Sequence, residues 1–468
     1  MSMNAASPAR RILRVLGAAL AAPRTGAILW ALAILLHLAV FWIVRENPLQ
    51  SDALSYQLTA ERLRSLAHYD PYWPPGLPLY LVGWSALFGA LGSSIAVARA
   101  SMLPVFFLLA WLLYRALLRT AGRPAANLAL LAVTLQPMFL LYSVTPFTQL
   151  PVGLLLATAL WVFVQATERS TLARTLVLAL ALALLPLFRA SALLLAALLP
   201  ALLWRRSRRW RDLAVPALAV GVALGLWLVK AHDLAGRFVP VNSANVRNVY
   251  VGNNPWTPLY RTWWFSNHRT EDAGVPAGFI AARDSIDALP DGERDAALRR
   301  GALDHVARRP DLFALRSINR VRAFFALDIL TASYARRYHG LDSPLVYAGI
   351  VGLDGLVFLG ATALAWLVLL APSLPPFQRR LIRYAWICGG LYALPYFLAF
   401  SHPTYHFPLI PLFLLGALAA LGGTVDDALA LLASPFRAGR GRRLAAVGGL
   451  ALLVAIQVEW VLINALAG

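Results

Sequence analysis

Apolar runs of about 20 residues recur along almost the whole chain, and short polar stretches separate them. A helix rises 1.5 Å per residue, so a run of about 20 apolar residues can cross the hydrocarbon core of a bilayer. The pattern predicts spans near positions 26–44, 97–114, 125–143, 151–167, 174–187, 190–204, 212–231, 344–370, 384–400, 405–421 and 444–464. The predicted fold class is therefore an all-α polytopic membrane protein with about eleven transmembrane helices.

The longest polar stretch divides this pattern into three parts. Residues 1–231 form an N-terminal transmembrane module that carries its first outer loop at 45–76. Residues 232–343 form a long outer segment with amphipathic helices, which is predicted to be periplasmic. Residues 344–468 supply the C-terminal transmembrane helices. The N-terminal arginines and the apolar run after them could be a signal peptide, but no convincing cleavage site follows, so we expect an uncleaved first span.

Charge fixes the expected orientation. The formal net charge is +20, and arginines cluster between the apolar runs, as in proteins whose basic loops face the cytoplasm. If the short apolar run 77–92 crossed the membrane, the arginines at 115–123 and the next two basic clusters would fall outside. We therefore expect 77–92 to lie in the membrane interface. The segments 51–76, 142–150, 188–191, 232–343 and 401–406 then share the outer face.

Composition excludes several other classes of protein. Hydrophobic residues make up 59% of the chain and charged residues only 14%, which a soluble domain could not bury. The basic balance follows the membrane pattern and does not indicate a nucleic-acid partner. Cys388 is the only cysteine, so an intrachain disulfide cannot form. No metal-ligand spacing and no phosphate-binding glycine loop occurs, so we expect no metal and no cofactor.

The first outer loop holds the strongest candidate for chemistry. Asp52 follows the first span directly, and a carboxylate beside lipid is costly unless it has a function or a partner. Asp52 is therefore a candidate catalytic base. The alternative is that Asp52 caps the helix that follows it, with Ser51 and Glu61 sharing its solvation.

The order of outer-face motifs resembles the glycosyltransferase C superfamily. Its bacterial aminoarabinose transferases and protein O-mannosyltransferases share an outer acid after span one, followed here by Tyr56 and a Pro-Pro-Gly turn at 74–76. LFRASALLL at 187–195 resembles the family's arginine at the outer start of a span. VYVGNNP at 249–255 resembles its Gly-Asn-Asn-Pro loop. SHPTYHFPLIPLFLL at 401–415 resembles its late segment.

The resemblance implies a membrane glycosyltransferase of the bacterial inner membrane. Such an enzyme moves a sugar from a polyprenyl-phosphate donor to an acceptor hydroxyl at the periplasmic face, with inversion. The acceptor would be a glycan, a lipid or a protein, and membrane lipids would surround the site. Asp52 would be the base. The implied substrate-binding residues are Tyr56, Arg189, Asn253, Asn254, His402, Tyr405 and His406.

The chain departs from the family pattern in three places. Gln149 follows Thr148 where relatives often carry an acid. His402 and His406 flank Tyr405 where relatives often carry arginine. Ala53 follows Asp52, so the first acid is not an Asp-Glu pair. These differences argue against assuming the substrates of the aminoarabinose transferases.

Alternatives remain open for several residues and for the function. Arg189 could only snorkel at a helix end. Binding of anionic lipid headgroups is favoured over sugar-phosphate binding for Arg316, Arg320 and Arg322. A transporter or lipid flippase would share the hydrophobicity, and a lipid-linked glycan ligase would share the cavity. Convergence of Asp52 and Arg189 on one outer cavity that opens toward lipid would favour an enzyme.

Overall fold

Every regular element in the described part of the chain is a helix. The computed structural model describes residues 8–65, 71–260 and 275–466. Residues 66–70 of the predicted first outer loop and 261–274 of the long outer segment lie outside this part. The predicted all-α polytopic membrane fold is confirmed.

In the order of the chain, helices occur in each of the three parts that the sequence predicts. The first part holds α1 (Pro8–Ala21), α2 (Thr25–Val44), α3 (Ser51–Ser65), α4 (Gly76–Phe88), η1 (Gly89–Leu91), α5 (Ser94–Ala100), α6 (Met102–Thr120), α7 (Arg123–Leu135), α8 (Pro137–Tyr142), α9 (Gln149–Glu168), α10 (Leu172–Phe188), η2 (Ala190–Ala192), α11 (Leu193–Ser207) and α12 (Arg211–Ala235). The second holds α13 (Ala244–Gly252), α14 (Ala277–Asp287), α15 (Asp291–Arg308), α16 (Pro310–Phe324) and α17 (Leu330–His339). The third holds α18 (Pro344–Leu370), α19 (Pro376–Leu398), η3 (Pro403–His406), α20 (Leu409–Leu418), α21 (Val425–Arg437) and α22 (Arg440–Leu466).

Within the described residues, 7 helical stretches are long and apolar enough to cross a membrane. They are Thr25–Val44, Ser94–Thr120, Gln149–Glu168, Ala190–Ser207, Arg211–Ala235, Pro344–Leu370 and Arg440–Ile463. The other predicted spans correspond to shorter apolar helices, or to α19, which carries Arg379, Arg380 and Arg383 near its start. The exact number of spans stays a prediction.

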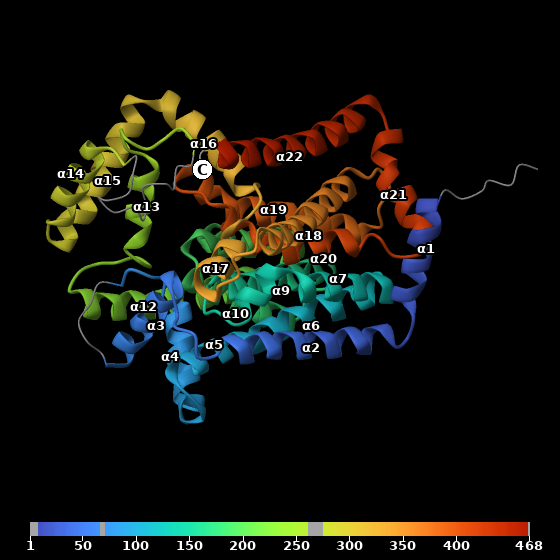
Figure 1. The fold of residues 1–468 in the computed structure, drawn as a ribbon, viewed down its shortest axis with the longest axis horizontal. Helices are drawn as coiled ribbons and strands as arrows, with labels where there is room; N and C mark the ends of the chain where they lie inside the picture. The colour runs from blue at the N-terminus through green and yellow to red at the C-terminus, as the bar shows by residue number, and fades with distance from the viewer. Residues whose placement is uncertain (1–7, 66–70, 261–274, 467–468) are drawn as a thin grey trace, which may run out of the picture.

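Helix α4 is set apart from the bundle. It runs at a large angle to α2 and projects away from the body (Figure 1). Its 13 residues span about 20 Å, whereas the hydrocarbon core is about 30 Å thick. Both observations support the expectation that this stretch lies in the interface.

The predicted span 125–143 is broken in the structure. Gln136 is extended (ψ 123°) because the residue before a proline avoids the helical region, and Pro137 starts a new short helix. The buried carboxylate of Asp354 accepts a hydrogen bond from the freed N–H of Met138 at 2.8 Å. An acid inside span α18 therefore has a structural partner at this break.

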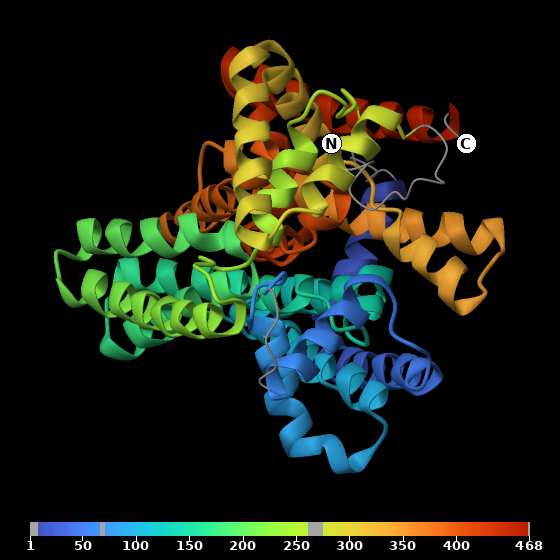
Figure 2. The same cartoon turned by 90° about the vertical axis from the view of Figure 1, so that its left-hand side faces the viewer.

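The outer helices lie at one end of the molecule. Helices α13, α14 and α15 are at the opposite end of the long axis from α1 and α21 (Figure 1), and they face the viewer together with α3 in Figure 2. They share a small core of their own, formed by Tyr250, Phe279, Leu298 and Ala302. The main core is separate and surrounds α9 and α20. All ten residues of α20 are buried.

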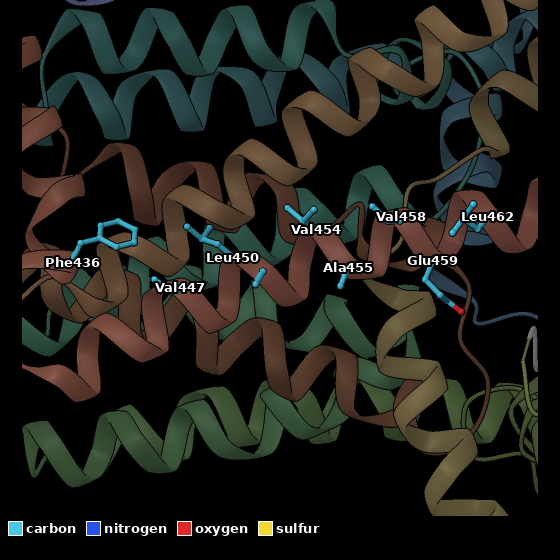
Figure 3. A pocket seen from close by; sticks show the side chains of 9 residues that line it. Phe436, Val447, Leu450, Val454, Ala455, Val458, Glu459 and Leu462 are labelled. Carbon is cyan, nitrogen blue, oxygen red and sulfur yellow. The ribbon is translucent and has the colours of Figure 1, made fainter.

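One hollow in the described part is an apolar groove along α22 and not a site for polar chemistry. It measures about 700 Å³, and its lining side chains come almost wholly from α22 (Figure 3). All of them are apolar except Glu459. Because α22 is apolar enough to span a membrane, lipid chains are expected to fill this groove.

The orientation makes a testable prediction. In a Cys388→Ser background, Arg119→Cys and Arg206→Cys should both resist a membrane-impermeant maleimide added to intact cells, because both arginines are expected inside. Leu303→Cys, on exposed α15, should be labelled and serves as the control. Labelling of both Arg119→Cys and Arg206→Cys would show that the stretch 77–92 crosses the membrane.

Candidate active site

A cavity of about 250 Å³ lies where the outer helices meet the bundle. Its walls come from four regions of the chain that are far apart in sequence. The main lining residues are Tyr56 and Trp73 from the first loop, Phe188, Arg189 and Ser191 from the α10–η2 junction, Asn242, Asn245 and Asn248 from the start of the outer segment, and Tyr396, Phe400 and Tyr405 from the late segment.

A break between two helices places Arg189 in this cavity. Helix α10 ends at Phe188, and Arg189 is extended (φ −154°, ψ 108°) before η2 begins. The guanidinium lies 5.2 Å from the ring centroid of Tyr405. It forms no hydrogen bond or ion pair with another described residue, and its Nε is buried without a partner. The donors of Arg189 are therefore available to an anion.

Asp52 lies beside the cavity, in the first turn of α3. Ser51 directly before it adopts a left-handed conformation (φ 54°) that turns the chain into the helix. Asp52 forms no hydrogen bond or ion pair with another described residue, so the geometry does not support the capping alternative. Its carboxylate interacts electrostatically with Arg189, Tyr56 and Tyr405, although Asp52 is not itself among the lining residues.

The surroundings of Asp52 favour its protonated form. Burial raises the pKa of Asp52 above that of an ordinary aspartate, and the positive charge of Arg189 offsets part of this effect. A carboxylate with a raised pKa binds a proton more strongly than an exposed one does. This is a useful property in a base.

Aromatic side chains form much of the cavity wall. The rings of Tyr56 and Trp73 lie 4.7 Å apart, and the indole N–H of Trp73 donates to Ser55 Oγ at 2.6 Å. On the other side, Tyr396 and Tyr405 stack at 4.6 Å. Apolar ring faces with a few fixed polar groups are typical of small-molecule sites.

Two predicted substrate ligands, Asn253 and Asn254, do not line the cavity. Both are buried, and their amides close the loop after α13. Asn254 Oδ1 accepts from the backbone N–H groups of Trp256 and Thr257, each at 2.9 Å. Asn253 Nδ2 donates to the Leu398 carbonyl at 3.2 Å. The structure gives these two amides a structural role, because their hydrogen bonds are already made within the protein.

His402 and His406 also lie outside the cavity lining. His406 is buried, stacks on Phe358 at 3.5 Å and lies 2.9 Å from the Phe324 carbonyl oxygen through Nδ1. His402 caps η3 by accepting from the Thr404 N–H. Burial lowers the pKa of His402 to about 4, so this ring is neutral near pH 7.

The arginines of α16 were expected to bind lipid headgroups, but in the structure they contact other parts of the protein. Arg316 and Arg320 are 3% and 0% exposed, and both donate to backbone carbonyls of the outer segment. Arg322 forms an ion pair with Glu459 of α22 and lies over the ring of Tyr260 at 4.7 Å. All three are held inside the protein.

The cavity uses asparagines other than the predicted pair. Asn245 and Asn248 lie three residues apart on α13 and therefore share one side of that helix, which faces the cavity. The spacing of three residues between Asn245 and Asn248 is visible in the sequence and could have identified them as a pair on one side of a helix. Gln149, which replaces the family's second acid, is buried and does not line the cavity.

Comparisons with known proteins give one structural likeness to report. A crystal structure of ArnT from Cupriavidus metallidurans in the apo state is similar to this chain at 16% identity, with a TM-score of 0.35, over 85% of this chain and 78% of that chain. No model of a protein family and no curated protein matches the sequence. At this TM-score the likeness is weak, and the function proposed below depends on the geometry of the cavity.

Two asparagine variants should separate structure from binding. Asn254→Ala removes buried hydrogen bonds and should lower the free energy of unfolding by about 1–3 kcal/mol. Asn248→Ala should leave stability nearly unchanged and lower substrate turnover several-fold, because it removes a cavity contact. Thermal unfolding and turnover of both purified variants test this prediction. If the Asn254→Ala protein is as stable as the parent but has lost turnover, Asn254 binds substrate and its role is not structural.

Proposed function

We propose that this protein is a membrane glycosyltransferase that moves a sugar from a polyprenyl-phosphate donor to an acceptor hydroxyl at the periplasmic face of the bacterial inner membrane. The observation that carries the proposal is the relation between Asp52 and Arg189. Arg189 lines the cavity and Asp52 lies beside it; the two groups interact electrostatically, yet they form no ion pair with each other. Each is therefore free to act on a substrate placed between them.

The reaction assigns one task to each charged group. The acceptor oxygen attacks the anomeric carbon on the face opposite the phosphate, so the configuration inverts. Asp52 takes the proton of the attacking hydroxyl as the new C–O bond forms. The bond from the anomeric carbon to the phosphate oxygen breaks, and that oxygen leaves with the electron pair. Arg189 stabilises the negative charge on the departing polyprenyl phosphate.

The position of the cavity suits a lipid-linked donor. Leu193 and Leu194 line it and are each 37% exposed, at the start of a stretch apolar enough to span a membrane. A polyprenyl chain could lie against such leucines while its phosphate reaches Arg189. This arrangement supports an enzyme at the edge of the bilayer over a transporter or flippase, which would need a path between the two sides.

The proposal is tested by comparing envelopes. Mass spectrometry of glycolipids, glycans and glycoproteins should show a sugar-modified species in cells that carry the protein and not in cells that lack it. Cells that carry Asp52→Asn should resemble the cells without the protein. The modified species also identifies the donor sugar and acceptor, and a transferred oligosaccharide would indicate a lipid-linked glycan ligase instead.

Asp52→Asn should lower turnover by roughly 10²–10⁴-fold, the usual effect of losing a general base. The protein should still insert and purify normally, because asparagine keeps the size of the side chain. A capping role predicts near-normal turnover, since asparagine caps helices about as well as aspartate. Turnover with the sugar donor found in the envelope comparison decides between the two roles.

The rate should also depend on pH in a defined direction. Asp52 must be ionised to accept a proton, and burial raises its pKa. Turnover should therefore fall as the pH drops through this raised pKa, at a higher pH than for an exposed aspartate, whose pKa is about 3.9. This fall in turnover at low pH, the acidic limb of the pH profile, should be absent from the residual turnover of Asp52→Asn. An unchanged acidic limb in that variant would assign it to another group.

A further inference from the structure

We propose that Arg320 is a positioning residue that holds two walls of the cavity together. It is remote from the reacting atoms and acts through the helices that it joins. Its effect on sugar transfer rests on the function proposed above, whereas its effect on the distance between the walls does not.

The two walls come from different parts of the fold. Helix α13 of the outer segment supplies Asn245 and Asn248, and the C-terminal end of α19 supplies Tyr396. Helices α13, α14 and α15 share a small core of their own, and no buried residue of α13 belongs to the main core. A direct connection between α13 and α19 is needed to give the cavity a defined width.

Arg320 makes this connection with one guanidinium. Its Nη1 donates to the Leu398 carbonyl of α19 at 2.9 Å. Its Nη2 donates to the Gly252 carbonyl of α13 and to Asn253 Oδ1, the latter at 3.1 Å. Asn253 Nδ2 in turn donates to Leu398, which closes a ring of contacts between the walls. The side chain is 0% exposed, so water does not compete for these bonds.

Glycine at position 252 permits the close approach that Arg320 bridges. A Cβ atom added to Gly252 would overlap the carbonyl oxygen of Ala399, directly after α19. The two backbones therefore touch without an intervening side chain. Any larger residue must push α13 away from α19.

A planar guanidinium suits this role better than an ammonium group. Arginine presents several donors in fixed directions, so it can bond to both walls at once. Lysine keeps the positive charge but concentrates its donors on one nitrogen. Arg320→Lys should therefore retain the charge and loosen the connection between α13 and α19.

Arg316 provides a matched control on the same helix. It is also a buried arginine that donates to backbone carbonyls, those of Asn254 and Thr257, and it lies 2.9 Å from His305 Nε2. All of these partners belong to the outer segment. Arg316→Lys removes a comparable set of bonds without acting on the junction with α19.

The first measurement requires no substrate. Spin labels are placed at Leu303→Cys on α15 and Leu394→Cys on α19, both exposed, in the full-length Cys388→Ser protein in nanodiscs. Arg320→Lys and Gly252→Ala should each broaden the distribution of distances between the labels or shift it to longer distances. Arg316→Lys should leave the distribution close to that of the parent. An unchanged distribution in both Arg320→Lys and Gly252→Ala overturns the proposal, whatever reaction the protein catalyses.

The second measurement separates positioning from simple loss of structure. Arg189 lies on the bundle side, so Arg320→Lys should bind polyprenyl phosphate nearly as well as the parent protein. Turnover should fall by roughly 10²-fold, as expected when catalytic geometry shifts by about 1 Å. If the walls separate but turnover is unchanged in a protein that transfers sugar, the positioning role is wrong. If Arg320→Lys does not fold, Gly252→Ala is measured in the same two ways.

Discussion

The unpaired guanidinium of Arg189 is the constraint on which the rest of the site depends. A buried positive charge is costly unless hydrogen bonds or an opposite charge compensate for it. The protein provides only partial compensation here, through the Tyr405 ring and the electrostatic influence of Asp52. An anion that enters the cavity can accept hydrogen bonds from the donors of Arg189, which gives the site affinity for a phosphate.

Buried arginines elsewhere in the described part of the protein are hydrogen-bonded to backbone carbonyls. The lack of such partners therefore distinguishes Arg189 from them and is not a general feature of the fold. Arg99 donates to the carbonyls of Asn47 and Val144, both at 2.9 Å, and ties α5 to two distant loops. Arg320 does the same between α13 and α19. These arginines use backbone carbonyls as acceptors and need no carboxylate. Their Nη donors are occupied, whereas those of Arg189 remain available.

The sequence predicted the all-α membrane fold for a physical reason, and it also pointed to residues that the structure gathers around one cavity. Apolar runs determine helices in a bilayer, since a spanning backbone must satisfy its own hydrogen bonds. The motif comparison also brought Tyr56, Arg189 and Tyr405 to one cavity, with Asp52 beside it. Asn253 and His406 lie outside the cavity lining. Residue type cannot distinguish a side chain that closes a loop from one that faces a ligand. That distinction depends on contacts with Leu398 and Phe324, which are far away in the sequence.

The pairing of Asp52 with Arg189 also gives the proposed reaction an internal order. The positive charge of Arg189 opposes the effect of burial on Asp52 and so favours the carboxylate. When a donor phosphate binds, its negative charge neutralises that of Arg189 as seen by Asp52. The pKa of Asp52 then rises further, and the carboxylate becomes a stronger base when the donor is in place. A site with one acid and one arginine can thus couple donor binding to activation of the acceptor without a second carboxylate at Gln149.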